Sequence, residues 1–114
     1  MAACRELGVA VVCYAPLERG FLTGRFKFPE DFPEGDIRRL LPRFSKENFP
    51  KNLKVVEAFE EMAQSKGVSV SALALAWLLA QGDDVIPIPG TTKPKNADAN
   101  IQSLSIALTP EENA

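Results

Sequence analysis

Histidine is absent from the 114-residue sequence, and cysteine occurs only twice. Histidine is the commonest general base near neutral pH and the commonest metal ligand, so its absence removes the usual candidate for both roles. The cysteines, Cys4 and Cys13, lack metal-ligand spacing, and Cys13 lies in an apolar run that is typical of a small core residue. We therefore expect neither a metal site nor a reactive thiol.

A strong charge of either sign is also missing, because 13 Lys and Arg residues nearly balance 15 Asp and Glu residues and leave a net charge of −2. Without a broad basic surface, we expect neither nucleic acid nor an acidic membrane as a partner. No apolar run is long enough for a signal peptide or a membrane span. A soluble cytoplasmic protein with at most one small domain fits this composition best.

Two apolar runs, Val9–Tyr14 and Val85–Ile88, have the length of strands. Such runs are typical of parallel strands that are covered on both faces. Periodicity and capping residues predict the helices, which are Ala2–Leu7 ended by Gly8, Leu53–Lys66 ended by Gly67, Val70–Gln81 capped by Ser69, Pro94–Leu104, and a helix that starts with a capping box at Thr109. Strands that alternate with helices indicate an α/β fold with parallel strands.

The segment from Ala15 to Pro50 has no strong periodicity, and prolines, glycines and aromatic residues are interspersed along it. A loop of this length inside a compact domain is unusual and is often functional. The alternative is a poorly ordered segment, although disordered segments are usually poor in aromatic residues.

The second apolar run ends in a turn with the features of a phosphate site. Gly90 lets a ligand approach the backbone, and Thr91 and Thr92 offer hydroxyl donors. Lys93 adds a positive charge, and the following helix directs free N–H groups and the positive end of its dipole toward an anion. The alternative is an ordinary strand-to-helix turn with a surface lysine, which occurs in many α/β proteins.

In (β/α)8 barrels, the loops after the seventh and eighth strands often build a phosphate site. Two parallel strands, of which the second leads into Gly90–Lys93, suit that position. A doubly wound sheet is the competing architecture, but the sequence lacks its Gly-x-Gly-x-x-Gly fingerprint. Because two parallel strands cannot enclose a core, we expect the chain to be part of a larger fold, with Met1 as a start imposed on it and the last helix cut short.

Three ordered motifs resemble the aldo-keto reductase family. Tyr14–Gly24 resembles the family segment Tyr-Ser-Pro-Leu-x-x-Gly-x-Leu-Thr-Gly, Ala72–Gln81 is similar to the seventh barrel helix, and Ile86–Lys93 with Asn100 and Ile101 resembles the eighth strand and nucleotide loop. The sequence and spacing of these motifs resemble most closely the plant auxin-induced and perakine-reductase-like branch of the family. The resemblance implies an α/β fold in the form of a partial TIM (β/α)8 barrel. Residues 1–114 would then be the C-terminal part of that barrel, an incomplete domain that consists of the last two strands with their helices.

The resemblance also implies a set of contacts with NADP. In the first loop, it places the nicotinamide ring on Tyr14, the pyrophosphate on backbone groups of Ala15, Pro16, Leu17 and Glu18, and the segment from Gly20 to Arg25 over the dinucleotide. In the second loop, it places the adenosine 2′-phosphate on Gly90, Thr91, Thr92 and Lys93. It places the adenine near Asn96 and Asn100. A 2′-phosphate site favours NADP over NAD. Without the resemblance, Tyr14 would be interpreted as a half-buried residue at a strand end, and Arg19 and Arg25 as solvated loop charges.

Three positions depart from the family pattern. Ala15 stands where relatives usually have serine, which removes one side-chain donor, and Ala99 stands where many relatives have glutamate. Glu18 stands where many relatives have Gly or Ala, and a carboxylate near a pyrophosphate is unfavourable unless it points away or pairs with Arg19.

The family's catalytic tetrad of Asp, Tyr, Lys and His belongs to earlier strands, and nothing in this chain matches it, so we assign no catalytic residue. We expect the cofactor-binding C-terminal portion of an NADP-dependent aldo-keto reductase, which reduces small-molecule carbonyl substrates by hydride transfer, and an isolated chain that is inactive. The alternatives are a nucleotide-binding module without chemistry and a non-catalytic interaction module. The latter would dock on a partner or self-associate through unpaired apolar surface at Val9–Cys13 and Ala72–Leu79.

Overall fold

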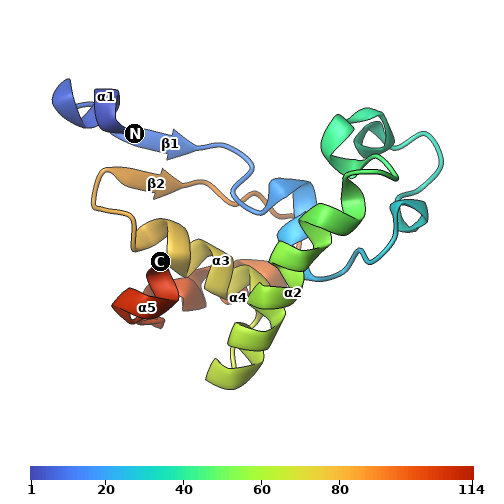
Figure 1. The fold of residues 1–114 in the computed structure, drawn as a ribbon. Coiled ribbons are helices and arrows are strands. Elements are labelled where there is room, and N and C mark those ends of the chain that lie inside the picture. Colours follow the sequence, from blue (N-terminus) through green and yellow to red (C-terminus); the bar gives the residue numbers. More distant parts are fainter.

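A computed structural model describes residues 1–114 as a two-stranded parallel sheet with helices packed beside it (Figure 1). The strands are β1 (Val11–Cys13) and β2 (Val85–Pro87), and the helices are α1 (Ala2–Glu6), α2 (Phe49–Lys66), α3 (Val70–Leu79), α4 (Pro94–Gln102) and α5 (Pro110–Asn113). Short 3₁₀ turns occur at Glu18–Thr23, Pro29–Asp31, Ile37–Leu40, Pro42–Phe44 and Ser103–Ser105. The predicted α/β class and the parallel pairing are confirmed, although both strands are shorter than the apolar runs that contain them.

The sheet brings the two candidate loops together. Val11 of β1 pairs with Val85 of β2, and the backbone N–H of Ile88 donates to the Cys13 carbonyl at 3.3 Å, just where both strands end. Because parallel strands run in the same direction, their carboxyl ends lie at one edge of the sheet. The loop that follows Cys13 and the loop that follows Ile88 therefore begin side by side.

Only one face of the sheet is covered within this chain. Val85 is buried against α3, whereas Val12 and its partner Ile86 are 58% and 46% exposed. Successive side chains of a strand point to opposite faces, so Val12 and Ile86 lie on the face away from α3. The expected coverage on both faces is thus found on one face only, because no element of the chain packs on the other.

Helix α3 is the centre of the helical part. It contacts β2, α2, α4 and the turn at Ser103–Ser105, and residues Ala72–Ala76 are all buried. Burial on several sides explains why the helix is apolar nearly all round. Its start is as predicted, because the Ser69 hydroxyl accepts a hydrogen bond from the Ala72 N–H at 3.2 Å. The expectation that Ala72–Leu79 offers a docking face is wrong for Ala72–Ala76, whose side chains are occupied by contacts within the chain.

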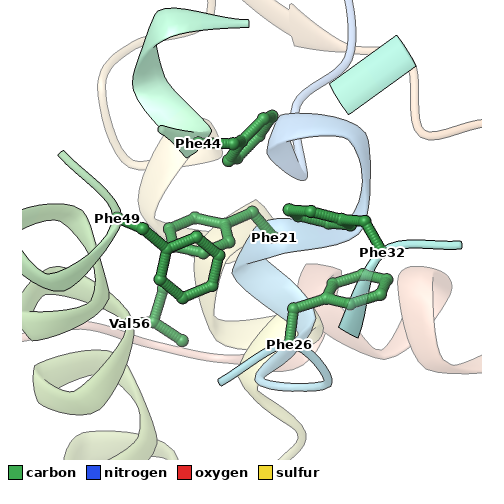
Figure 2. Packing of buried hydrophobic residues seen from close by; sticks show 6 residues of the cluster. All are labelled: Phe21, Phe26, Phe32, Phe44, Phe49 and Val56. Atoms are coloured by element: carbon green, nitrogen blue, oxygen red, sulfur yellow. The ribbon is translucent and has the colours of Figure 1, made fainter. Parts of the chain in front are cut away.

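Five phenylalanines and Val56 form a separate apolar cluster beside α2 (Figure 2). The phenylalanines are Phe21, Phe26, Phe32, Phe44 and Phe49, and their ring centroids lie 4.7–6.1 Å apart in edge-to-face or tilted pairs. Such geometry is favourable for aromatic pairs. The segment from Ala15 to Pro50 is therefore organised around its own core, and the interpretation as a poorly ordered segment is wrong.

The other helix ends that capping residues predict are mostly found, whereas α3 stops at Leu79 rather than at Gln81, and α4 stops at Gln102 rather than at Leu104. Helix α2 starts at Phe49 rather than at Leu53, because Pro50 is tolerated in the first turn of a helix and Phe49 is anchored in the aromatic cluster. The predicted stop at Gly67 is confirmed by a left-handed φ of 65°. At α5, Thr109 and Glu112 exchange both hydrogen bonds of the predicted capping box.

No single helix is both long and apolar enough to cross a membrane. Helices α2 and α3 reach that length and composition only when taken together, and they are bent by 97° at the break between them.

Candidate functional site

The loops after β1 and β2 line one cleft of about 870 Å³. The predicted site residues that line it are Tyr14, Ala15, Pro16, Leu17, Gly20, Arg25, Gly90, Thr91, Lys93, Asn96 and Asn100. The parallel pairing of the strands explains this geometry, because both loops leave the same edge of the sheet. The segments around Leu17 and Lys93 are thus brought to a common cleft.

One end of the cleft is a smaller polar pocket of about 490 Å³, which has no hydrophobic residue in its wall. Its wall consists of Arg25, Gly90, Thr91, Thr92, Lys93 and Asn96. Arg25 comes from the first loop, and the other residues come from the second loop and the start of α4. Thr92 therefore lies at this polar end rather than along the main cleft.

Glu18 is the one predicted site residue that lines neither the cleft nor the polar pocket. Its carboxylate forms an ion pair with the guanidinium of Arg43. The partner is therefore Arg43 rather than Arg19, and the negative charge is drawn away from the cleft wall.

The cleft wall is strongly positive although the chain as a whole has a net charge of −2. Its charged residues are Arg19, Arg25, Arg38, Lys93 and Lys95, and no carboxylate is among the lining side chains. Thr23, Ser69 and Ser71 add hydroxyl groups. A wall that combines cations with neutral donors attracts anionic ligands and focuses their approach.

Tyr14 is 77% exposed at the end of β1 and lines the cleft. The alternative interpretation, a half-buried tyrosine at a strand end, is wrong. An exposed aromatic ring at the rim of a cleft offers a flat apolar surface to a ligand.

The turn after β1 is strained. Ala15, Glu18 and Arg19 have left-handed φ angles of 51°, 49° and 55°, although none of them is glycine. Conformations of this kind are unfavourable for residues with a side chain, and they cluster at ligand sites where the surrounding structure enforces them.

The second loop enters α4 with an open backbone. The Lys93 N–H donates to the Thr91 hydroxyl at 3.1 Å, and α4 follows from Pro94. A Cβ atom added at Gly90 would meet nothing within 4 Å, so packing within the chain does not require glycine at this position.

Sequence reasoning missed several residues of the cleft, above all Arg38, Lys95, Ser69 and Ser71. Arg38 lies in the segment without periodicity, where no local pattern indicates which side chain returns to the cleft. Ser69 carried only the signal of a helix cap, and that role is real. No group of three or more metal-ligating side chains lies close enough together to hold an ion.

Comparison with known proteins identifies the family to which the chain belongs. The family model described as "Aldo/keto reductase family" matches residues 1–114. The chain belongs to the aldo-keto reductase family. Its resemblance to this family of oxidoreductases, indicated by the three motifs, is therefore confirmed.

Two curated relatives are similar to this chain over nearly its whole length. "Aldo-keto reductase yakc [NADP(+)]" of Schizosaccharomyces pombe is 54% identical over 109 residues, which are 96% of this chain and 32% of the relative. "Aldo-keto reductase str7" of Strobilurus tenacellus is 46% identical over 114 residues, which are 100% of this chain and 34% of the relative.

A solved structure, that of the glycerol dehydrogenase AKR11B4 from Gluconobacter oxydans, superposes with a TM-score of 0.83 at 37% sequence identity. The match covers 96% of this chain and 33% of that protein. The chain thus spans about a third of the length of the relatives that it matches. Its α/β arrangement with a two-stranded parallel sheet is consistent with part of an aldo-keto reductase barrel.

Proposed function

We propose that this chain is the cofactor-binding, C-terminal portion of an NADP-dependent aldo-keto reductase whose whole barrel reduces aldehydes or ketones. The observation that carries the proposal is the common cleft of the two loops. It is lined by no carboxylate and by five cations, of which Arg38 is paired with Asp36 behind the wall and four are in no ion pair. NADP carries three phosphate groups, and a wall of this charge compensates them without introducing repulsion.

The polar pocket fits the adenosine 2′-phosphate. Arg25 can bind two phosphate oxygens with its planar fork, and Lys93 adds a second positive charge. Thr91 and Thr92 supply hydroxyl donors, and the free space at Gly90 leaves room for a ligand at the backbone. The name of the Schizosaccharomyces pombe relative includes NADP(+), which agrees with this choice of cofactor.

The part of the cleft that is lined by Tyr14–Leu17 suits the nicotinamide and the pyrophosphate. The exposed ring of Tyr14 offers a stacking surface, and Ala15, Pro16 and Leu17 border the space beside it. The ion pair with Arg43 compensates the charge of the Glu18 carboxylate, which would otherwise repel a pyrophosphate in this turn. Asn96 and Asn100 line the cleft from α4, and we place the adenine beside them.

When bound, NADPH supplies the hydride, and this chain contributes binding and orientation rather than proton transfer. Reduction of a carbonyl needs an acid beside the developing alkoxide. The chain has no histidine, and its single tyrosine is Tyr14, to which we give the stacking role. We therefore infer that the isolated chain does not turn over carbonyl substrates.

Three finer assignments belong to the same proposal. On the motifs Tyr14–Gly24 and Ile86–Lys93, we place the chain near the plant auxin-induced and perakine-reductase-like branch, as the last two strands and helices of a TIM barrel. A cytoplasmic location fits the two free thiols, Cys4 and Cys13, because cytosolic cysteines are kept reduced.

Calorimetric titration of the chain with NADP⁺, together with an assay of NADPH oxidation with a reactive aldehyde, tests the proposal. We expect saturable heat of NADP⁺ binding and no aldehyde-dependent oxidation of NADPH. Absence of heat at millimolar NADP⁺ would contradict the binding role, and sustained turnover would contradict the assignment of no catalytic residue.

A second candidate function is a non-catalytic interaction module, which self-associates or docks on a partner. The specific observation is the open face of the sheet, where Val12 and Ile86 are exposed, together with Val9 and Ile88, which are exposed next to the strands. Exposed apolar surface of this kind marks interfaces. Size-exclusion chromatography with light scattering tests it, since a discrete complex favours the module and heterogeneous aggregate contradicts it.

A further inference from the structure

Arg38 is the most highly connected side chain beside the cleft. Its Nε and Nη2 donate to the two carboxylate oxygens of Asp36 at 3.0 and 2.6 Å, and its Nη1 donates to the Arg19 carbonyl at 2.8 Å. The guanidinium lies over the rings of Phe26 and Phe32, at 4.6 and 4.5 Å from their centroids. One side chain thus joins the aromatic cluster to the turn that borders the cleft.

The Arg19 carbonyl belongs to the strained part of that turn. Glu18 and Arg19 hold left-handed φ angles of 49° and 55°, which are unfavourable for residues with a Cβ atom. A turn of this kind persists only where external contacts enforce it. Arg38 holds the carbonyl of Arg19, and Arg43 holds the carboxylate of Glu18, so the contacts come from outside the turn.

Asp36 fixes the position of Arg38. A carboxylate that accepts two parallel bonds from a guanidinium sets the plane and the direction of the arginine fork. The side chains of Asp36 and Arg38 are only 16% and 18% exposed, so solvent competes weakly for these bonds. The side-chain and backbone donors of Arg38 lower the pKa of Asp36 to about 2, so the carboxylate remains charged at neutral pH.

We propose that Asp36 and Arg38 form a clasp that pre-shapes the Glu18–Thr23 turn for the cofactor, with Asp36 as a positioning residue. Asp36 does not line the cleft and acts through Arg38, which does. This inference rests on the proposed function for its ligand, but the clasp itself is a property of the chain without any ligand. It concerns the turn that borders the pyrophosphate rather than the second loop around Lys93. Of the polar pocket, Arg25 is the residue tied to this turn, because its N–H donates to the Thr23 hydroxyl at 3.4 Å.

The variant Asp36→Asn removes the ion pair of the clasp and keeps the helix cap. The Oδ1 atom of Asp36 also accepts a bond from the Arg38 N–H at 2.9 Å, and asparagine keeps that acceptor because it caps helices as well as aspartate does. Asparagine removes the charge and replaces the second acceptor of the fork by a donor. The matched control is Asp31→Asn, because Asp31 accepts bonds from the N–H groups of Lys27 and Phe28 and has no contact with Arg38.

The first readout is hydrogen exchange of the full chain without ligand, measured residue by residue by NMR. The N–H groups of Gly20 and Leu22 both donate to the Leu17 carbonyl, so their exchange reports opening of the turn. We expect Asp36→Asn to speed their exchange roughly tenfold and Asp36→Glu to restore part of the protection, while Asp31→Asn leaves it unchanged. Unchanged exchange at Gly20 and Leu22 in Asp36→Asn overturns the clasp.

The second readout separates positioning from general stability. We expect Asp36→Asn to weaken NADP⁺ binding roughly tenfold and to change the affinity for adenosine 2′-monophosphate less than about threefold, because the latter has an adenine and a 2′-phosphate but no pyrophosphate or nicotinamide to contact the turn. Equal weakening of both ligands overturns the positioning role. A wild-type chain that binds no NADP⁺ overturns the proposed function and the ligand part of this inference, and the exchange readout then decides the clasp by itself.

Discussion

Arg25 and Lys93 line the same polar pocket, although Arg25 belongs to the loop after β1 and Lys93 to the loop after β2. The parallel pairing of Val11 with Val85 brings this about, because it places both loops at one edge of the sheet. Two cations from distant parts of the sequence thereby face one small volume that contains no carboxylate. The proposed selectivity for NADP over NAD rests on this pair.

Replacement of Lys93 by methionine tests the contribution of its charge. Hydrogen bonds between charged groups contribute about 1.5–3 kcal/mol, so we expect Lys93→Met to weaken NADP⁺ binding roughly tenfold to a hundredfold. NAD⁺, which lacks the 2′-phosphate, is expected to change less than threefold. Calorimetric titration measures both, with Lys54→Met on the exposed side of α2 as the control. Equal losses for the two dinucleotides would exclude a contact with the 2′-phosphate.

The aromatic cluster provides a stability test with an internal control. Phe32 is 1% exposed in the centre of the cluster, whereas Phe28 in the same loop is 64% exposed. We expect Phe32→Ala to lower the free energy of unfolding by about 3–5 kcal/mol, and Phe28→Ala to lower it by less than about 0.5 kcal/mol. Urea unfolding followed by circular dichroism measures the difference. Similar losses in the two variants would show that the cluster is not the core of this segment.

Much of the fold could be predicted from local patterns. Ser69, Gly67 and the capping box at Thr109 mark helix ends, and the structure uses each of them as predicted. These signals work because a cap depends on a few neighbouring residues. The start of α2 does not follow from a local pattern, because Pro50 resembles a loop residue and Phe49 is held by aromatic rings from distant positions.

The site was predictable where it follows strand ends, and not where it depends on long-range contacts. Tyr14 and Lys93 were identified from motifs, and both line the cleft. Arg38 was not identified, because its position is set by Asp36, Arg19 and two phenylalanine rings rather than by a periodic pattern. The partner of Glu18 was likewise decided by the folding of the loop, which brings Arg43 to its carboxylate.

The charge of Asp36 predicts a pH dependence of stability. Its pKa in the folded chain is about 2, below the ordinary value of 3.8, mainly because the Arg38 side chain donates to the carboxylate. A lowered pKa stabilises the fold above the unfolded value and loses this effect as the pH falls through the folded value. We expect wild type to exceed Asp36→Asn in stability at pH 7, and the difference to shrink between pH 4 and pH 2. Thermal unfolding at a series of pH values measures it, and a difference that stays constant to pH 2 would contradict the ionic role of Asp36.

Two glycines with similar backbone angles distinguish strain from a packing contact. Gly24 and Gly35 have φ angles of 73° and 78°, but an added Cβ would meet the Glu60 carboxylate at position 24 and nothing within 4 Å at position 35. Left-handed strain costs about 1 kcal/mol or more in each alanine variant. We expect a larger loss in Gly24→Ala, because displacement of Glu60 also disturbs its ion pair with Lys27. Urea unfolding compares the two variants, and equal losses would show that the contact with Glu60 is unimportant.

The central claim is that the turn after β2, together with Arg25, holds the phosphate that distinguishes NADP from NAD. Titration of the wild-type chain with NADP⁺ and with NAD⁺ under the same conditions tests it most directly, since the two ligands differ only in the 2′-phosphate. The account predicts that NADP⁺ binds at least about tenfold more tightly and that added salt reduces the difference. Equal affinities, or tighter binding of NAD⁺, would contradict it.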